Sequence, residues 1–173
     1  MDPQQEMELV QRAQQGAVSA FEQLIAHYQS RLLRYLMLRG LQRADAEDAV
    51  QTAFINAWQH LHSYRPAWRF STWLYRIAGR AAADINSSNA QTESLVEQHL
   101  ADAQSNPAGP EDNIWLLARQ HLAAASFDLL WLHYGEGFNG AEIARIKQRS
   151  RVWVRVNLLR ARQQLQYKLK QAG

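Results

Sequence analysis

The segment 136–165 places the strongest constraint on the fold of this 173-residue chain. Between residues 145 and 162 it holds seven Lys or Arg residues and no Asp or Glu. Asn139, with Glu142 three residues later, has the pattern of a capping box at a helix N-terminus. Ser150 is of the type preferred as the N-cap of a second helix. The sequence therefore predicts two helices joined by a tight turn, the second of them strongly basic.

The second predicted helix has one apolar side and one cationic side. Apolar residues recur along it at spacings of four, three and four, as on an amphipathic helix. They are Val154, Leu158, Ala161 and Leu165. A helix side with a single sign of charge is typical of contact with phosphates, because solvated surfaces usually mix signs. The pattern indicates a DNA-binding helix-turn-helix, and an Arg-rich surface helix is the alternative.

Helical periodicity also accounts for the rest of the chain, since strand and hairpin signals are nearly absent. A second group of helices is expected to begin near Asn113 and to lead into the helix-turn-helix. We therefore predict an all-α fold. The N-terminal helices are expected over residues 6–14, 18–38, 45–61 and 72–85.

Two helix starts and two core positions are predicted in the N-terminal half. Asp45 and Ser71 are of the type that caps a helix N-terminus, and each precedes a helical pattern. Phe54 and Trp58 fall on an apolar stripe. We expect both aromatic side chains to be buried.

Charge divides the chain into three parts. Residues 1–88 carry nine Lys or Arg and eight acids, and 89–113 carry five acids without a Lys or Arg. Residues 114–173 carry ten Lys or Arg and three acids. The net charges are therefore +1, −5 and +7. We predict two small helical domains, 1–88 and 113–173, joined by an acidic flexible linker over 89–112.

Composition and motifs exclude several classes of site. The absence of cysteine excludes a disulfide framework and a thiolate zinc site, and it fits a reducing cytoplasm. No signal pattern or membrane-length apolar run occurs. The histidines lack metal-site spacing, and no Gly-rich phosphate loop or Ser nucleophile motif is found. We expect a cytoplasmic protein that is not an enzyme, without metal, cofactor, small-molecule substrate or direct membrane insertion.

Three stretches, in this order, resemble the extracytoplasmic-function (ECF) sigma factors, the minimal two-domain class of bacterial RNA polymerase sigma factors. They are DAEDAVQTAFINAW (45–58), FSTWLYRIA (70–78) and EGFNGAEIARIKQRSRVWVRVNLLRAR (136–162). The resemblance covers nearly the whole chain. It implies a region 2 helical bundle, a region 4 helix-turn-helix domain, and the function of directing core RNA polymerase to promoters and helping to open them. An anti-sigma factor is a further partner that the resemblance allows.

The resemblance implies that the helix 45–61 docks on a coiled coil of the largest polymerase subunit. Polar residues off its buried stripe are free to meet that partner, although acids also favour a helix N-terminus through its dipole. The candidates are Asp45, Glu47, Asp48, Gln51, Thr52 and Asn56.

The resemblance assigns the −10 element to the loop and helix over 62–85. The segment 64–76 interleaves aromatic residues with arginine, a pattern suited to unpaired bases, although a structural aromatic cluster is the alternative. The candidate −10 contacts are Arg65, Trp68, Arg69, Ser71, Arg76 and Arg80.

The resemblance assigns the −35 element to the C-terminal helix-turn-helix, and it places the linker toward the RNA exit path. The candidate −35 contacts are Arg149, Ser150, Arg151, Trp153, Arg155, Asn157 and Arg160.

Two departures from the family pattern affect the DNA-binding parts. Lys147-Gln148-Arg149 stands where the family has an apolar residue, a glycine and another apolar residue, and glycine suits a left-handed turn better than Gln. After Ile85 the family often has a basic run, whereas here 86–89 is Asn-Ser-Ser-Asn. We expect weaker DNA binding from this region. The alternatives are a degenerate sigma-like regulator or a stand-alone helix-turn-helix DNA-binding protein.

Overall fold

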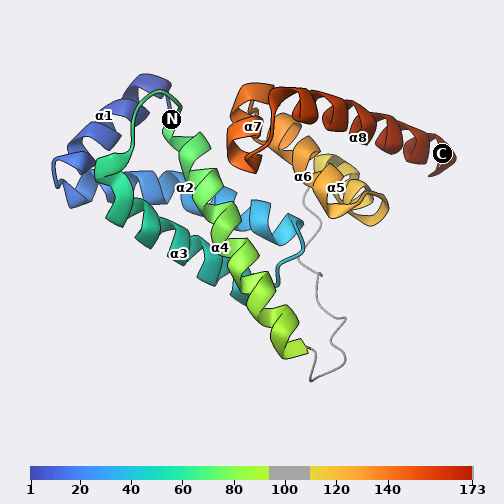
Figure 1. Cartoon of the computed structure of the whole chain (residues 1–173), viewed down its shortest axis with the longest axis horizontal. Coiled ribbons are helices and arrows are strands. Elements are labelled where there is room, and N and C mark those ends of the chain that lie inside the picture. The colour runs from blue at the N-terminus through green and yellow to red at the C-terminus, as the bar shows by residue number, and fades with distance from the viewer. Residues whose placement is uncertain (94–109, 173) are drawn as a thin grey trace. The chain divides into compact units, whose positions relative to one another are not determined.

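The computed structural model describes residues 1–93 and 110–172, and its contacts divide the chain into two compact units, Met1–His99 and Leu100–Gly173 (Figure 1). Every regular element in the described ranges is a helix, so the all-α prediction is confirmed. None of the helices described is both long and apolar enough to pass through a membrane.

Unit 1 is built from four helices and one short 3-10 turn. The elements are α1 (Pro3–Gln14), α2 (Val18–Leu38), α3 (Arg43–His60), η1 (Leu61–Ser63) and α4 (Phe70–Glu93). Helix α3 packs against both α2 and α4, and α1 packs against α2 (Figure 1). Leu24, Leu36 and Leu74 are fully buried between them. The predicted limits of α2 are confirmed.

Both predicted N-caps in unit 1 are wrong. Helix α3 begins at Arg43 after Gln42, so Asp45 lies inside its first turn. Helix α4 begins at Phe70, so Ser71 lies inside the helix, where it is buried.

Helix α4 also continues past its predicted end at residue 85 to Glu93, and two of its polar residues there bond back to the helix. The hydroxyls of Ser87 and Ser88 donate to the carbonyls of Ala83 and Asp84, each at 3.0 Å. The predicted linker therefore loses residues 89–93 to α4.

Unit 2 packs α8 against three preceding helices. The elements are α5 (Pro110–His121), α6 (Ala124–Leu130), the π-helix η2 (Trp131–Gly135), α7 (Gly140–Lys147) and α8 (Arg151–Ala172). Phe127, Leu130 and Val154 are buried in its core. Because α5 begins at Pro110, residues 110–112 of the predicted linker are helical too, and its remaining part lies outside the described residues.

Both predicted caps of the helix-turn-helix are confirmed. The Asn139 side chain accepts from the amides of Ala141 and Glu142 at 2.9 and 3.0 Å. The Glu142 carboxylate accepts from the Asn139 amide at 2.9 Å, which completes the capping box. Ser150 Oγ accepts from the Trp153 amide at 3.1 Å at the start of α8.

Candidate polymerase and nucleic-acid interfaces

An apolar groove of about 780 Å³ runs between α2 and α3 in unit 1. Ile55 is 50% exposed and Trp58 38% exposed along it, although the Trp58 ring packs on Phe21 with 4.9 Å between centroids. The prediction that Trp58 is a core residue is therefore wrong, whereas Phe54 is buried as predicted. Contact with Phe21 of α2 thus leaves the Trp58 side chain accessible. The groove therefore offers a partner an exposed apolar surface.

The six expected polymerase-binding residues lie on two sides of α3. Glu47 and Gln51 line the groove, where Arg43 Nε donates to Glu47 Oε1 at 2.9 Å. The others do not line the groove, and they follow one another at spacings of three or four. They are Asp45, Asp48, Thr52 and Asn56.

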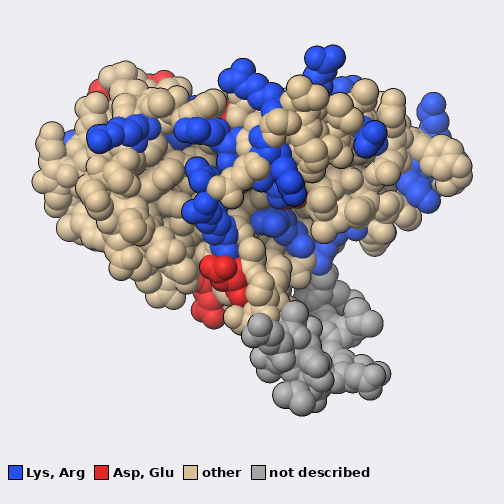
Figure 2. All heavy atoms as spheres, viewed as in Figure 1, with Lys and Arg blue, Asp and Glu red and all other residues tan. Residues whose placement is uncertain are grey.

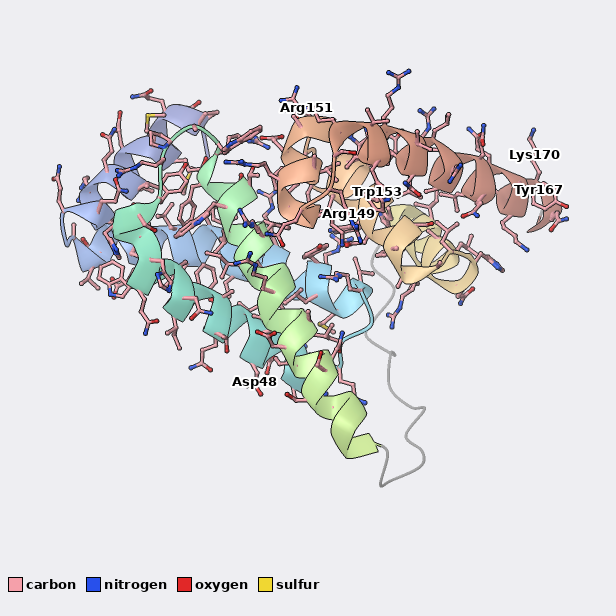
Figure 3. All side chains as sticks on the ribbon, in the orientation of Figure 1. Asp48, Arg149, Arg151, Trp153, Tyr167 and Lys170 are labelled. Atoms are coloured by element: carbon pink, nitrogen blue, oxygen red, sulfur yellow. The ribbon has the colours of Figure 1, made fainter. Side chains whose placement is uncertain are left out.

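The residues outside the groove differ in solvent exposure and in their contacts with other helices. Asp48 and Thr52 are exposed, and Asp48 points outward from α3 (Figure 3). Asp45 is partly buried and accepts a hydrogen bond from Asn89 Nδ2 at 3.0 Å. This contact ties Asp45 to α4. The polar residues therefore do not form one continuous patch, and the groove adds Ile55 and Trp58, which the choice of polar residues missed.

The loop between η1 and α4 is fixed to α1. Gln14 Nε2 donates to the carbonyls of Leu61 and Tyr64 at 2.9 and 3.1 Å. Inside the loop, the Tyr64 hydroxyl donates to the Trp68 carbonyl at 2.5 Å. These bonds give a defined shape to η1 together with the loop that follows it, which we call loop 61–69.

A smaller pocket of about 160 Å³ lies between α1 and this loop, with Trp68, Arg69 and Tyr64 in its wall. Glu6 of α1 also lines it and accepts a hydrogen bond from the buried Tyr28 hydroxyl. Burial, and to a smaller extent the negative charge of Glu6, raises the pKa of Tyr64 to about 12. The pKa of Tyr28 is also raised, first by burial and then by its hydrogen bond to Glu6. The pocket therefore combines aromatic walls, a cation and a carboxylate.

Five of the six expected −10 residues reach the surface of unit 1. Arg65 and Arg69 are exposed on the loop, and Trp68 is half-buried beside them. On α4, Arg80 is exposed and Arg76, one turn earlier, is half-buried. The exception is Ser71, which is 7% exposed. Ser71 is therefore no longer a candidate contact, because its position in α4 leaves its side chain buried inside unit 1.

The turn before α8 adopts the left-handed conformation that suits the glycine found at this position in the family. Gln148 has φ 54° and ψ 46°, and it is the only non-glycine with positive φ in the described ranges. Its amide donates to the carbonyls of Ala144 and Arg145 and thereby closes α7. Lys147 pairs with Asp128, which is 1% exposed in α6. The structure thus explains why a lysine can stand at position 147, where the family has an apolar residue. A buried carboxylate neutralises its charge.

The expected −35 residues differ in exposure along the turn and α8. Arg149 lies over the Trp153 ring, with 5.3 Å between the guanidinium carbon and the ring centroid (Figure 3). Asn157 is half-buried and donates to the Trp153 carbonyl at 2.8 Å, so it is engaged within its own helix. The remaining candidates are all exposed. They are Ser150, Arg151, Arg155 and Arg160.

Among the charged side chains around α8, positive ones predominate. Figure 2 shows Lys and Arg repeatedly along this helix, with few acidic atoms on the same face. No Asp or Glu follows Glu142 in the sequence. In the described part of the chain, no group of three His, Asp or Glu side chains could hold a metal ion.

The sequence comparisons place these features in a known family. The family model for sigma-70 region 2 matches residues 24–90. The RNA polymerase sigma-H factor of Pseudomonas aeruginosa is 31% identical over 176 residues, which covers 92% of this chain and 91% of that protein. This chain belongs to the ECF sigma factor family. The ECF RNA polymerase sigma-E factor of Escherichia coli K12 is 43% identical over 74 residues, covering 43% of this chain and 38% of that protein.

Solved structures support the fold of this ECF sigma factor. CnrH, in complex with the cytosolic domain of CnrY, matches with a TM-score of 0.73 and 24% identity over 98% of this chain and 99% of that one. The sigma factor RpoE of Bartonella quintana, in complex with the anti-sigma factor NepR, matches with a TM-score of 0.67 and 20% identity over 87% and 96%. The region 2 match of this sigma factor contains every residue that lines the groove between α2 and α3 except Phe21, and it contains the whole loop 61–69.

Proposed function

We propose that this RNA polymerase sigma factor divides promoter recognition among three surfaces. The groove between α2 and α3 binds core polymerase, the pocket beside loop 61–69 takes an unpaired base of the −10 element, and α8 reads the −35 element. The observation that carries the proposal is that one chain presents both an exposed apolar groove and an acid-free basic helix.

The groove has the features of a site for a helical partner. Its exposed Ile55 and Trp58 provide apolar contact, and Glu47 and Gln51 provide polar contacts beside them. A helix laid into such a groove is a recurring mode of recognition. The family resemblance implies such a helical partner, namely a coiled coil of the largest subunit of core polymerase. We infer that an anti-sigma factor competes for this unit, in line with the anti-sigma complex of the Bartonella quintana relative.

The pocket beside loop 61–69 suits a base taken out of the stack. Housing an extruded base requires a small cavity with aromatic or apolar walls and polar groups for the base edge. Trp68 and Tyr64 supply the walls, and Glu6 supplies an acceptor. Arg65 and Arg69 are exposed at the loop and are placed to meet phosphates. Arg76 and Arg80 extend this cationic surface along α4.

Helix α8 suits duplex DNA because its first two turns carry exposed arginines and follow a tight turn. In helix-turn-helix proteins the N-terminal residues of the second helix contact base edges. Arg151 and Arg155 lie there, and Ser150 and Arg149 precede them. We infer that the protein acts in the cytoplasm, without catalysis of its own, and that its linker runs toward the RNA exit path.

The test is run-off transcription with purified core polymerase on a genomic promoter library, with and without this chain. We expect discrete new start sites that share a promoter motif. Stable polymerase binding without transcripts would favour the degenerate sigma-like regulator. Failure of both would favour a stand-alone DNA-binding protein.

Variants separate the groove from the basic helix in the same assay. Ile55→Asp places a charge in the groove and should abolish core polymerase binding, because the charge would have to be desolvated there. Ile114→Asp is the matched control, since Ile114 is 42% exposed in α5, outside the groove. Combined Arg151→Ala and Arg155→Ala should leave polymerase binding intact and remove promoter-selective starts. Normal starts from that double variant would contradict the placement of the reading helix.

A further inference from the structure

The exposed side of α8 has an apolar centre. Val152 is 71% exposed, Leu159 52% and Val156 39%, although all three are aliphatic. Their spacings of four and three place them on one side of the helix. Val154 and Ala161 are fully buried on the other side. At roughly 100° per residue, Val156 points almost directly away from this buried stripe.

Cations flank the apolar centre on both sides. Arg151 and Arg155 are exposed along one edge, and Arg160 is exposed along the other. Figure 3 shows Arg151 at the N-terminal end of α8. The centre of the DNA-facing side is therefore aliphatic, whereas the arginines occupy its margins.

This layout matches the chemistry of the major groove. A helix inserted there presents its centre to base edges and its margins to the phosphates of the two strands. Among the groups that base pairs expose in the major groove, the apolar one is the C5-methyl of thymine. We propose that Val152 and Val156 read thymine methyl groups of the −35 element, with Leu159 at the far end of the contact. This inference rests on the proposed role of α8.

The charges favour DNA over a protein partner for this side of α8. A second copy of the chain would bring arginines against arginines, and such like-charge contact is costly. The absence of any Asp or Glu after Glu142 leaves α8 without acids to balance its arginines in such a contact. Phosphates satisfy the arginines at both margins at once, which an apolar protein surface does not.

The spacing of the two valines limits the sequence that they can read. One helical turn advances about 5.4 Å, and successive bases of one strand are about 3.4 Å apart along the duplex axis. Val152 and Val156 therefore reach thymines in adjacent base pairs or in pairs one step further apart. The −35 element should contain at least two thymines at such a spacing.

Uracil substitution tests the inference directly. The full-length chain, alone and with core polymerase, is used to select a −35 element from a randomised duplex, and each dT is then replaced by dU. This change removes one methyl group and keeps base pairing. We expect about fourfold weaker binding at each contacted position, from about 0.8 kcal/mol per buried methylene-sized group and about 1.4 kcal/mol per tenfold.

Valine variants assign the effect to α8. In Val156→Ala the difference between dT and dU should disappear at one position, and Val152→Ala should remove it at another. Val156→Thr keeps the side-chain shape and should also weaken the discrimination, which guards against misfolding as the cause. Val18→Ala is the matched control, because Val18 is 57% exposed in unit 1 and should leave discrimination unchanged.

The outcomes distinguish the inference from the proposed function. Suppose that holoenzyme selects a −35 element and starts transcription, but replacing dT by dU changes the binding affinity at no position. The inference is then overturned and the proposed function stands. If no element is selected and no transcripts start, both fail. If the valine variants change self-association or protein binding while the dU response stays intact, this side of α8 serves a protein and the inference is overturned.

Discussion

Replacement of Gln148 by glycine should stabilise unit 2. Gln148 is held at φ 54° and ψ 46° between α7 and α8, where its amide closes α7. An L-residue pays for this left-handed conformation because its Cβ lies too close to the following carbonyl oxygen. The cost is about 1–2 kcal/mol. Glycine has no Cβ and adopts the conformation freely.

The net gain is smaller than the strain. A glycine loses more backbone entropy on folding, which costs about 0.5–1 kcal/mol. The Gln148 side chain is exposed, so its loss removes little packing. We therefore expect Gln148→Gly to raise the free energy of unfolding by about 0.5–1 kcal/mol. For a domain of this size that corresponds to about 2–8 °C in Tm.

Hydrogen exchange of amides in α7 and α8 measures this change in the full-length chain without interference from unit 1. Gln148→Ala is the decisive comparison, since it removes the same side chain but keeps Cβ. Gln163→Gly, at an exposed position inside α8, should instead destabilise by about 1 kcal/mol. If Gln148→Gly were no more stable than Gln148→Ala, the strain at this turn would be absent and the reasoning wrong.

Three further outcomes follow from contacts in the two units. Lys147→Met should lower the free energy of unfolding by about 3 kcal/mol in urea titrations, because it removes the Lys147 charge from the buried Asp128 carboxylate. Adding Asp128→Asn should recover most of the loss. Gly135→Ala should cost about 1–3 kcal/mol by the same measurement, since its Cβ would lie 2.8 Å from the buried Trp131 ring. Tyr64 has a pKa of about 12 in the folded protein, so its contribution is complete below its unfolded pKa of about 10 and is lost as pH rises toward 12. Unfolding measured across this window should depend less on pH in Tyr64→Phe, and an unchanged dependence would contradict the assignment.

Local signals in the sequence predicted the helices whose ends are set by local chemistry. The limits of α2 and the caps at Asn139 and Ser150 depend on residues within a few positions, and they are confirmed. The predicted caps at Asp45 and Ser71 failed because α3 and α4 begin one or two residues earlier. No side-chain hydrogen bond caps α3, so residue type gave no guide to its start.

Contacts between distant residues could not be predicted from pattern. The pair of Lys147 and Asp128 joins residues 19 apart, and the bond between Asn89 and Asp45 joins residues 44 apart. The exposure of Trp58 depends on how much of α3 is covered by α2. The apolar periodicity of α3 alone does not predict that coverage. The candidate polymerase residues were therefore chosen by polarity, and the apolar part of the groove was missed.

Helix α8 shows why periodicity alone cannot separate a core from a reading surface. The sequence contains a stripe through Val154 and Ala161 and a second aliphatic set through Val152 and Val156. Both have helical spacing, and either is compatible with burial. Packing against α6 and α7 buries the first set and leaves the second exposed. A binding role for the second set can therefore be inferred only once the structure shows that the first set forms the core.

The distribution of cations shifts promoter affinity toward unit 2. After Ile85, α4 continues with Ser87 and Ser88, whose hydroxyls bond to their own helix and provide no positive charge to phosphates. Residues 1–88 have a net charge of +1, whereas residues 114–173 have +7. Each phosphate neutralised adds to affinity and to its salt dependence. Under the proposed function, the aromatic side chains of loop 61–69 therefore carry more of the contact between unit 1 and the −10 element than its few arginines do, and they act on bases only once the duplex has opened. In the proposed division of roles, α8 then anchors the protein to closed promoter DNA, and the pocket beside loop 61–69 contributes once the duplex is open.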